Sequence, residues 1–259
     1  MLMLVILGIL VGLLMGLTGA GGGILAVPLL VFLTDINVTA AAPLALTAVF
    51  VAAAIGAMAG YWQGMLRYRA AAVMALLGML LAPVGLWAAH QMDNRLLMAV
   101  FSVLLIVVAV ESLRQKKQQT GDNVRCLLDP DTGRLRWTSR CSMSLIGAGS
   151  VAGFLSGLVG VGGGFVIVPA LGRLSNLSLQ AVIPTSLGVI ALVSLASLGS
   201  ALWWGSLDIV QAIPFIAGAM LGMLTGRRLT AYLAVSTMKR IFAAVALVVA
   251  VMMMVRAVG

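Results

Sequence analysis

Long apolar runs separated by short polar turns divide the chain into eight segments, four in each half. The runs are continuous and lack the alternation of membrane β-strands, so they predict α-helices. Three of the four in each half suit one membrane crossing, which takes about 20 helical residues. The segments lie roughly at Met1–Leu33, Thr39–Trp62, Ala70–Ala89, Leu96–Leu113, Met143–Leu174, Leu179–Trp204, Ile209–Leu224 and Ile241–Val255.

The first segment of each half is too long for a single crossing. As one helix, Met1–Leu33 would measure about 50 Å against a hydrocarbon core of about 30 Å. Glycine runs interrupt both long segments, at Gly19–Gly23 and again at Gly160–Gly164. Each run predicts a helical hairpin or a broken helix, with new half-helices that begin near Ile24 and Phe165.

The two glycine runs belong to an internal duplication with an offset of 141 residues. Between Gly16 and Thr47, 13 positions match their counterparts without a gap. The pair Val27-Pro28 returns as Val168-Pro169. A duplication of this length predicts an all-α membrane protein built from two homologous repeats, with 8 to 10 transmembrane segments.

The repeats are predicted at residues 1–113 and 143–259, joined by a basic loop at 114–142. We expect this loop to be a solvated cytoplasmic connector that contains a small hairpin around Pro130. Cys126 and Cys141, both in this region, lack metal-ligand spacing and a nearby histidine. We therefore expect reduced thiols, no metal site and no cofactor.

The composition supports a membrane protein, because 62% of the residues are hydrophobic and only 9% are charged. The net charge of +9 lies mainly in loops between helices. Basic residues in such loops are typical of the cytoplasmic side of a membrane protein, so we attribute the charge to membrane topology rather than to nucleic-acid binding. Met1–Leu17 lacks a basic start and a cleavage site, so we expect it to be membrane structure rather than a removed signal.

Corresponding loops of the two repeats have opposite charge bias. In the first repeat Arg67 and Arg69 follow the second apolar segment, whereas in the second repeat the basic loop Arg227–Arg240 follows the third. Because basic loops stay in the cytoplasm, the repeats are predicted to be inverted, with five helical pieces each and both termini outside. The alternative is eight crossings in two parallel repeats.

The half-helices after the glycine runs are candidate anion sites, because a helix N-terminus presents free amides and the positive end of its dipole. Hydroxyl groups nearby can contact an oxyanion without burying a charge. The candidate substrate-binding residues are Gly21, Gly22, Gly23, Thr47, Gly162, Gly163, Gly164, Thr185 and Ser186. The alternative is that the glycines serve close packing and the hydroxyls bond their own helix carbonyls.

Charged residues within the spans are nearly absent. We expect Glu111 to pair with a basic neighbour such as Arg114, and the single histidine, His90, to have a structural role in an external turn. No paired carboxylates, catalytic triad or nucleotide motif are present, so neither an enzyme nor an ATP-driven pump is expected. No proton relay stands out, which leaves protons and sodium open as coupling ions.

At these residues the chain resembles the sulfite exporter TauE/SafE family. The shared pattern is Gly-x-Gly-Gly-Gly, then Val-Pro, then a downstream Thr-Ser, and the resemblance covers almost the whole chain outside the central loop. It implies a bacterial inner-membrane carrier of sulfite, sulfonates or related anions, with both glycine runs and Thr185-Ser186 on the anion pathway. The first half departs from the pattern at Leu44-Ala45, which suggests unequal halves.

We therefore expect a secondary transporter that exports a small sulfur-containing anion across the lipid bilayer by alternating access between the repeats. One alternative is an uptake permease for another small organic anion. Another is a membrane assembly protein that does not transport. The sequence leaves open whether the protein forms a homo-oligomer.

Overall fold

The described part of the chain forms ten α-helices joined by short connections. This computed structural model describes residues 1–19, 21–34, 36–114, 126–127, 137–204, 209–230, 232 and 235–258. The helices are α1 (Leu2–Thr18), α2 (Gly21–Thr34), α3 (Val38–Trp62), α4 (Tyr68–His90), α5 (Asn94–Arg114), α6 (Ser139–Val159), α7 (Gly164–Leu174), α8 (Leu179–Trp204), α9 (Ile209–Leu229) and α10 (Val235–Val258). Both long first segments are divided, as predicted, which gives ten helical pieces rather than eight.

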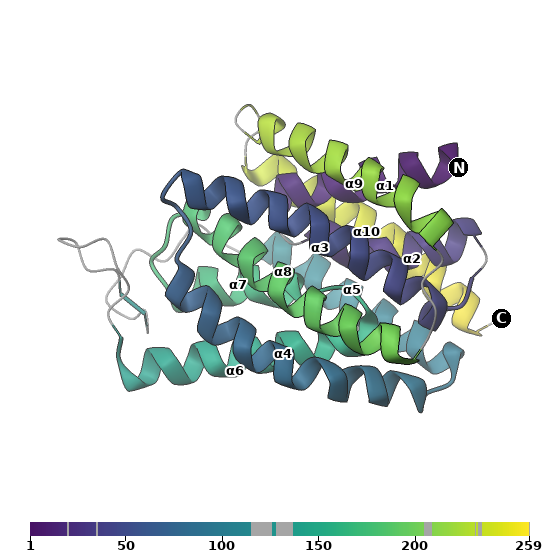
Figure 1. Cartoon of the computed structure of the whole chain (residues 1–259), viewed down its shortest axis with the longest axis horizontal. Coiled ribbons are helices and arrows are strands. Elements are labelled where there is room, and N and C mark those ends of the chain that lie inside the picture. Colours follow the sequence, from purple (N-terminus) through teal and green to yellow (C-terminus); the bar gives the residue numbers. More distant parts are fainter. Residues whose placement is uncertain are drawn as a thin grey trace.

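The helices run side by side along the long axis of the molecule (Figure 1). Both chain termini lie at the right-hand end of that view, which we call the terminal end. At the opposite end α4 and α6 begin and α9 ends. We call it the basic end, because Arg67, Arg140 and Arg227 lie in those helix ends.

Six helices in the described ranges are long and apolar enough to cross a membrane: α3, α4, α5, α6, α8 and α10. Helices α1, α2 and α7 are apolar but shorter. Helix α1 begins at the terminal end and α6 begins at the basic end, so the pairs α1–α2 and α6–α7 enter the bundle from opposite ends (Figure 1). The molecule is thus a multi-pass membrane protein with two divided segments.

Each divided segment folds back on itself at a glycine. A Cβ atom at Gly22 would overlap the carbonyl oxygen of Val11, and a Cβ at Gly163 would overlap that of Ala152. Helix α2 can therefore lie directly against α1, and the start of α7 against α6, because these positions carry no side chain. Both pairs of residues are related by the same offset of 141 residues.

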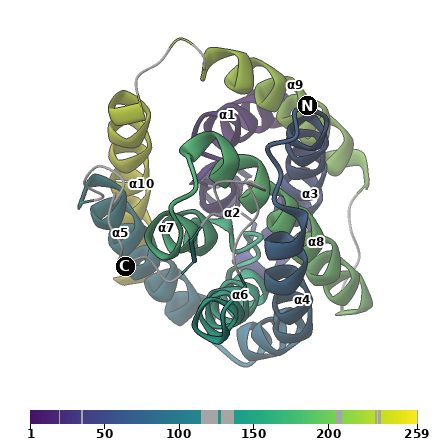
Figure 2. The same cartoon turned by 90° about the vertical axis from the view of Figure 1, so that its left-hand side faces the viewer.

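The first helix of each half packs mainly on the fourth helix of the other half, α1 on α9 and α6 on α4. Figure 2 looks along the helices and shows these two pairs on opposite sides of the bundle, with α2 and α7 toward the middle. In each pair a Cβ on the glycine stripe would press against the partner's backbone. The stripes are Gly8, Gly12 and Gly16 on α1 and Gly149, Gly153 and Gly157 on α6.

Other contacts join helices that occupy the same place in the two halves. Helix α3 packs on α8 and α5 packs on α10, while α2 touches α7. Helices α2, α3, α7 and α8 therefore meet in the interior. The two halves of the sequence interlock rather than forming two separate bodies.

The central connection differs from its prediction in one respect. Cys126 and Cys141 form a disulfide bond, so the expectation of reduced thiols is wrong. The backbone N–H of Cys126 also donates to the carbonyl oxygen of Leu174 at the end of α7 (2.8 Å). This part of the connection is thus tied to both α6 and α7. The predicted hairpin around Pro130 lies outside the described residues.

Candidate binding site at the two helix breaks

The second break, between α6 and α7, is an irregular turn of glycines. Gly160, Gly162 and Gly163 all have positive φ, at 69°, 79° and 65°. This left-handed region is readily accessible to glycine and strained for other residues. Helix α7 begins at Gly164, close to the predicted start near Phe165.

The first break, between α1 and α2, is shorter. Gly19 ends α1 in the left-handed region, with φ at 78°, and α2 begins at Gly21. Helix α2 thus begins three residues before the predicted start near Ile24, because Gly21–Gly23 form its first turn. Their amides still belong to the group that has no carbonyl partner in a preceding turn.

The two breaks meet in the interior. A Cβ at Gly23 in the first turn of α2 would lie 3.0 Å from the carbonyl oxygen of Val161 in the second break. Val49 of α3 borders both breaks. Its side chain would lie 3.6 Å from a Cβ atom at Gly23 and 3.0 Å from a Cβ atom at Gly162. The positive ends of two helix dipoles thus approach one region, which favours an anion.

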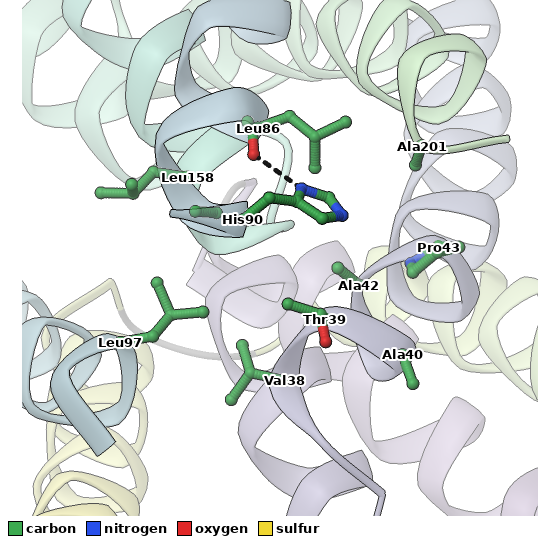
Figure 3. A pocket seen from close by; sticks show the side chains of 12 residues that line it. Val38, Thr39, Ala40, Ala42, Pro43, Leu86, His90, Leu97, Leu158 and Ala201 are labelled. Carbon is green, nitrogen blue, oxygen red and sulfur yellow. Dashed lines mark hydrogen bonds between the residues drawn. The ribbon is translucent and has the colours of Figure 1, made fainter. Parts of the chain in front are cut away.

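A cavity of about 300 Å³ opens at the terminal end, between the starts of α3 and α5 and the ends of α4, α6 and α8. His90 points its ring into this space, and its Nδ1 hydrogen-bonds the carbonyl oxygen of Leu86 at 2.9 Å (Figure 3). Leu158 and Ala42 also line the cavity. Ala42 touches the Cβ position of Gly160, so the cavity ends at the second break.

A larger cavity of about 520 Å³ opens at the basic end. Ile183 lines it and also touches the Cβ position of Gly19, so this cavity reaches the first break; Phe165 at the start of α7 lines it as well. Arg173 of α7 and Glu111 of α5 line its wall and form an ion pair. Glu111 therefore has a basic partner 62 residues further along the chain, because α5 and α7 lie side by side there. The side chain of Arg114, the partner predicted from the sequence, lies outside the described part of the structure.

The walls of the two cavities use corresponding positions of the two halves. Each of the following pairs has the 141-residue offset, with the first member at the terminal end and the second at the basic end: Thr39 and Gln180, Ala42 and Ile183, Ala89 and Thr230, Leu97 and Met238, and Leu158 and Leu17. The molecule therefore presents two related vestibules at opposite ends, each leading to a helix break.

The predicted hydroxyl residues have different surroundings. Thr47 donates to its own helix at the carbonyl oxygen of Pro43 (2.7 Å), and Thr185 does the same at Ala181 (2.6 Å). The Thr185 hydroxyl also accepts from the backbone N–H of Arg67 (3.0 Å). In this structure both hydroxyls therefore hydrogen-bond to backbone groups of the protein.

Ser186 is the predicted hydroxyl that reaches a break. Its Oγ lies 3.4 Å from the carbonyl oxygen of Gly19 and 2.8 Å from that of Ile183. The side chain is fully buried. Ser186 thus joins α8 of the second half to the break of the first half.

Sequence reasoning missed Ser194, which lies at the second break. A Cβ at Gly162 would overlap Ser194 Oγ, and it would lie 3.0 Å from Ile190 Cγ2. The spacing of four residues between Ser186, Ile190 and Ser194 places them on one face of a helix, which the sequence alone could have indicated. Only the structure shows that this face of α8 points toward the breaks.

These features define a membrane carrier architecture, in which interrupted helices meet in the interior and a cavity leads to them from each end. The chain belongs to the Sulfite exporter TauE/SafE family, whose model matches residues 4–253. The predictions of a membrane protein and of a transporter are thereby confirmed at the level of the family.

Relatives with similar sequences are named as membrane transporters. A probable membrane transporter protein of Xylella fastidiosa (strain Temecula1) is 30% identical over 251 residues, which cover 94% of this chain and 91% of the relative. One of Bacillus subtilis, YjnA, is 27% identical and covers 95% and 96% of the two chains. One of Methanocaldococcus jannaschii is 26% identical and covers 88% and 87%. No solved structure was found to match the chain.

Proposed function

We propose that this protein is a secondary transporter that exports a small sulfur-containing anion, such as sulfite or an organosulfonate, across a bacterial inner membrane. Transport proceeds by alternating access between two inverted repeats. The observation that carries the proposal is the pair of corresponding cavities, one at each end of the molecule, each of which reaches a helix break.

The anionic group is held by backbone amides at the starts of α2 and α7, that is, by Gly21 to Gly23 and by Gly162 to Gly164. Fixed amides and helix dipoles attract an oxyanion without placing a counter-charge in the membrane interior. A charged side chain buried at this depth would cost far more in desolvation than these neutral backbone groups do. The family description supports a sulfur oxyanion as the substrate class.

The direct test is flux in proteoliposomes that contain only the purified chain. Vesicles are loaded with sulfite or methanesulfonate, and efflux is followed under an imposed proton gradient, an imposed sodium gradient and neither. We expect efflux that saturates with substrate and is accelerated by one of the gradients. No efflux of either anion above empty vesicles under all three conditions overturns the proposal. An uptake permease coupled by symport would instead accelerate efflux only when the gradient of its coupling ion is directed outward.

The glycine site is tested with Gly163→Ala. Alanine at this position would have to adopt the left-handed backbone conformation of Gly163, which costs about 1–3 kcal/mol of strain. Its Cβ atom would also overlap the carbonyl oxygen of Ala152 and push it away. We expect efflux to fall about fivefold or more if this strain weakens anion binding by the same energy.

Gly199→Ala is the matched control for Gly163→Ala, because a Cβ at this position of α8 meets nothing within 4 Å. It is expected to transport at the wild-type rate. Wild-type efflux by Gly163→Ala, with the variant correctly folded by size-exclusion chromatography, would remove the break from the binding site.

A further inference from the structure

One face of α8 connects the two cavities and passes both breaks. Its residues, which we call the serine face, are Ile183, Ser186, Ile190, Ser194, Ser197 and Ala201. Their spacings of three and four residues place them on one side of a helix. Ile183 lines the basic-end cavity and Ala201 lines the terminal-end cavity. At a rise of 1.5 Å per residue the face is about 27 Å long, close to the thickness of a bilayer core.

The hydroxyls of the serine face lie where the helix breaks are. Ser186 reaches Gly19 in the first break, and Ser194 abuts Gly162 in the second. Ser197 shares a hydrogen bond of 3.3 Å with Ser156 of α6. Gly157, next to Ser156, lines the terminal-end cavity. The hydroxyls therefore continue from the first break to the edge of that cavity.

Ser194 has no hydrogen-bond partner, although its side chain is completely buried. Its Oγ is one of three buried side-chain atoms without a partner among the described residues, with Arg67 Nε and Arg227 Nη1. Leaving a buried hydroxyl unpaired is unfavourable, and a native protein that retains one needs a reason. The Ser194 hydroxyl lies just before the start of α7, where the backbone already favours an anion. A ligand that is bound there only part of the time would explain why this hydroxyl has no partner in the protein.

The corresponding face of α3 carries no hydroxyl group. The residues that match the serine face are Ala42, Ala45, Val49, Ala53, Gly56 and Gly60. Packing alone would be satisfied by such small residues, as it is on α3, so it does not account for the serines of α8. The difference also agrees with the unequal halves suggested by Leu44-Ala45.

We propose that the serine face of α8 is the path along which the anion crosses, and that Ser194 is a substrate ligand at the second break. This inference rests on the proposed transport function and extends it to residues outside the glycine runs. The ligand is a small oxyanion, because Ser194 Oγ abuts Gly162 just before the N-terminus of α7, where the helix dipole favours negative charge and disfavours a cation. Neutral donors suit a path, since they hold an anion strongly enough to enter and weakly enough to leave.

Ile190 and Val49 close the path in this structure. Both are buried, and both approach the Cβ position of Gly162 to 3.0 Å. Ile190 stands one helical turn from Ser186 on one side and one turn from Ser194 on the other. On the serine face, Ile190 therefore lies between the hydroxyls of Ser186 and Ser194, and Val49 packs beside it at Gly162. The pair thus forms the apolar gate between the vestibules.

The test of the path is Ser194→Ala in proteoliposomes, with sulfite and methanesulfonate as the probes. We expect the KM for efflux to rise about tenfold, the change expected for the loss of one hydrogen bond to a charged group. We also expect the substrate-free variant to melt at or above the wild-type temperature, because an unpaired buried hydroxyl has been removed. The rise in melting temperature that substrate produces in the wild type should shrink in the variant.

Ser102→Ala is the matched control, because Ser102 is equally buried but donates to its own helix at Met98 (2.9 Å). It is expected to keep the wild-type KM and to lose a little stability. A wild-type KM in Ser194→Ala, or a lower melting temperature without substrate, overturns the assignment of Ser194. Absence of flux in the wild type is a different result, since it overturns the transport function itself.

Discussion

At the residue scale, glycine has two separate roles in this protein. Along α1 and α6 the glycines are helical, and they allow the partner helix to approach until backbones touch. In the second break Gly160, Gly162 and Gly163 are needed for their left-handed backbone. Substitution by alanine distinguishes the two roles. In a packing glycine the new methyl group only fills space between helices, whereas in a left-handed glycine it also disfavours the backbone conformation.

The packing role predicts that Gly153→Ala destabilises the protein. A Cβ there would overlap the backbone of Gly78 on α4, and such overpacking costs about 1–3 kcal/mol. Gly147→Ala, in the same helix, meets nothing within 4 Å and should stabilise α6 by about 0.5–1 kcal/mol. Thermal melting of both variants in detergent checks this. Equal melting temperatures would contradict the close contact of α6 with α4.

At the scale of helices, the two hairpins differ although their sequences correspond. Helix α2 starts directly after a short break, whereas α7 starts after three left-handed glycines. The helices that face them differ too, because α8 offers serines where α3 offers alanine and glycine. We therefore expect the second break to hold the anion more tightly than the first.

The disulfide between Cys126 and Cys141 is the element-scale feature most open to a direct check. Both cysteines are completely buried and bonded to each other. Protein purified without reductant and then unfolded should bind no maleimide, and after reduction it should bind two equivalents. Labelling without reductant would contradict the bond. It would also agree with the reducing environment expected for a cytoplasmic loop.

At the scale of the whole molecule, the two sequence repeats are not two packing units. The contacts of α1 with α9 and of α4 with α6 cross between the halves and are the closest in the bundle. Moving one sequence half as a rigid body would break both contacts. We therefore expect alternating access to move units that contain helices from both halves.

The orientation of the whole molecule is tested with reporter fusions. Both termini share one end, and most arginines of the helix ends lie at the other, with Arg95 and Arg256 as the exceptions, so the excess of positive charge predicts that the termini are outside the cytoplasm. Alkaline phosphatase, which works only outside the cytoplasm, should be active when fused after Gly259 and inactive when fused after Arg114. Inactivity at both positions is the result that eight parallel crossings would give.

Local sequence determined the helices, their interruptions and their correspondence. Continuous apolar runs require helices in a bilayer, and glycine clusters mark where those helices stop, since both effects act between near neighbours in the chain. Tertiary structure alone decided which faces meet: Ser194 against Gly162, Arg173 with Glu111, and Cys126 with Cys141. These contacts join residues far apart in the sequence or on different elements, and they depend on how whole helices pack. No local pattern specifies that packing.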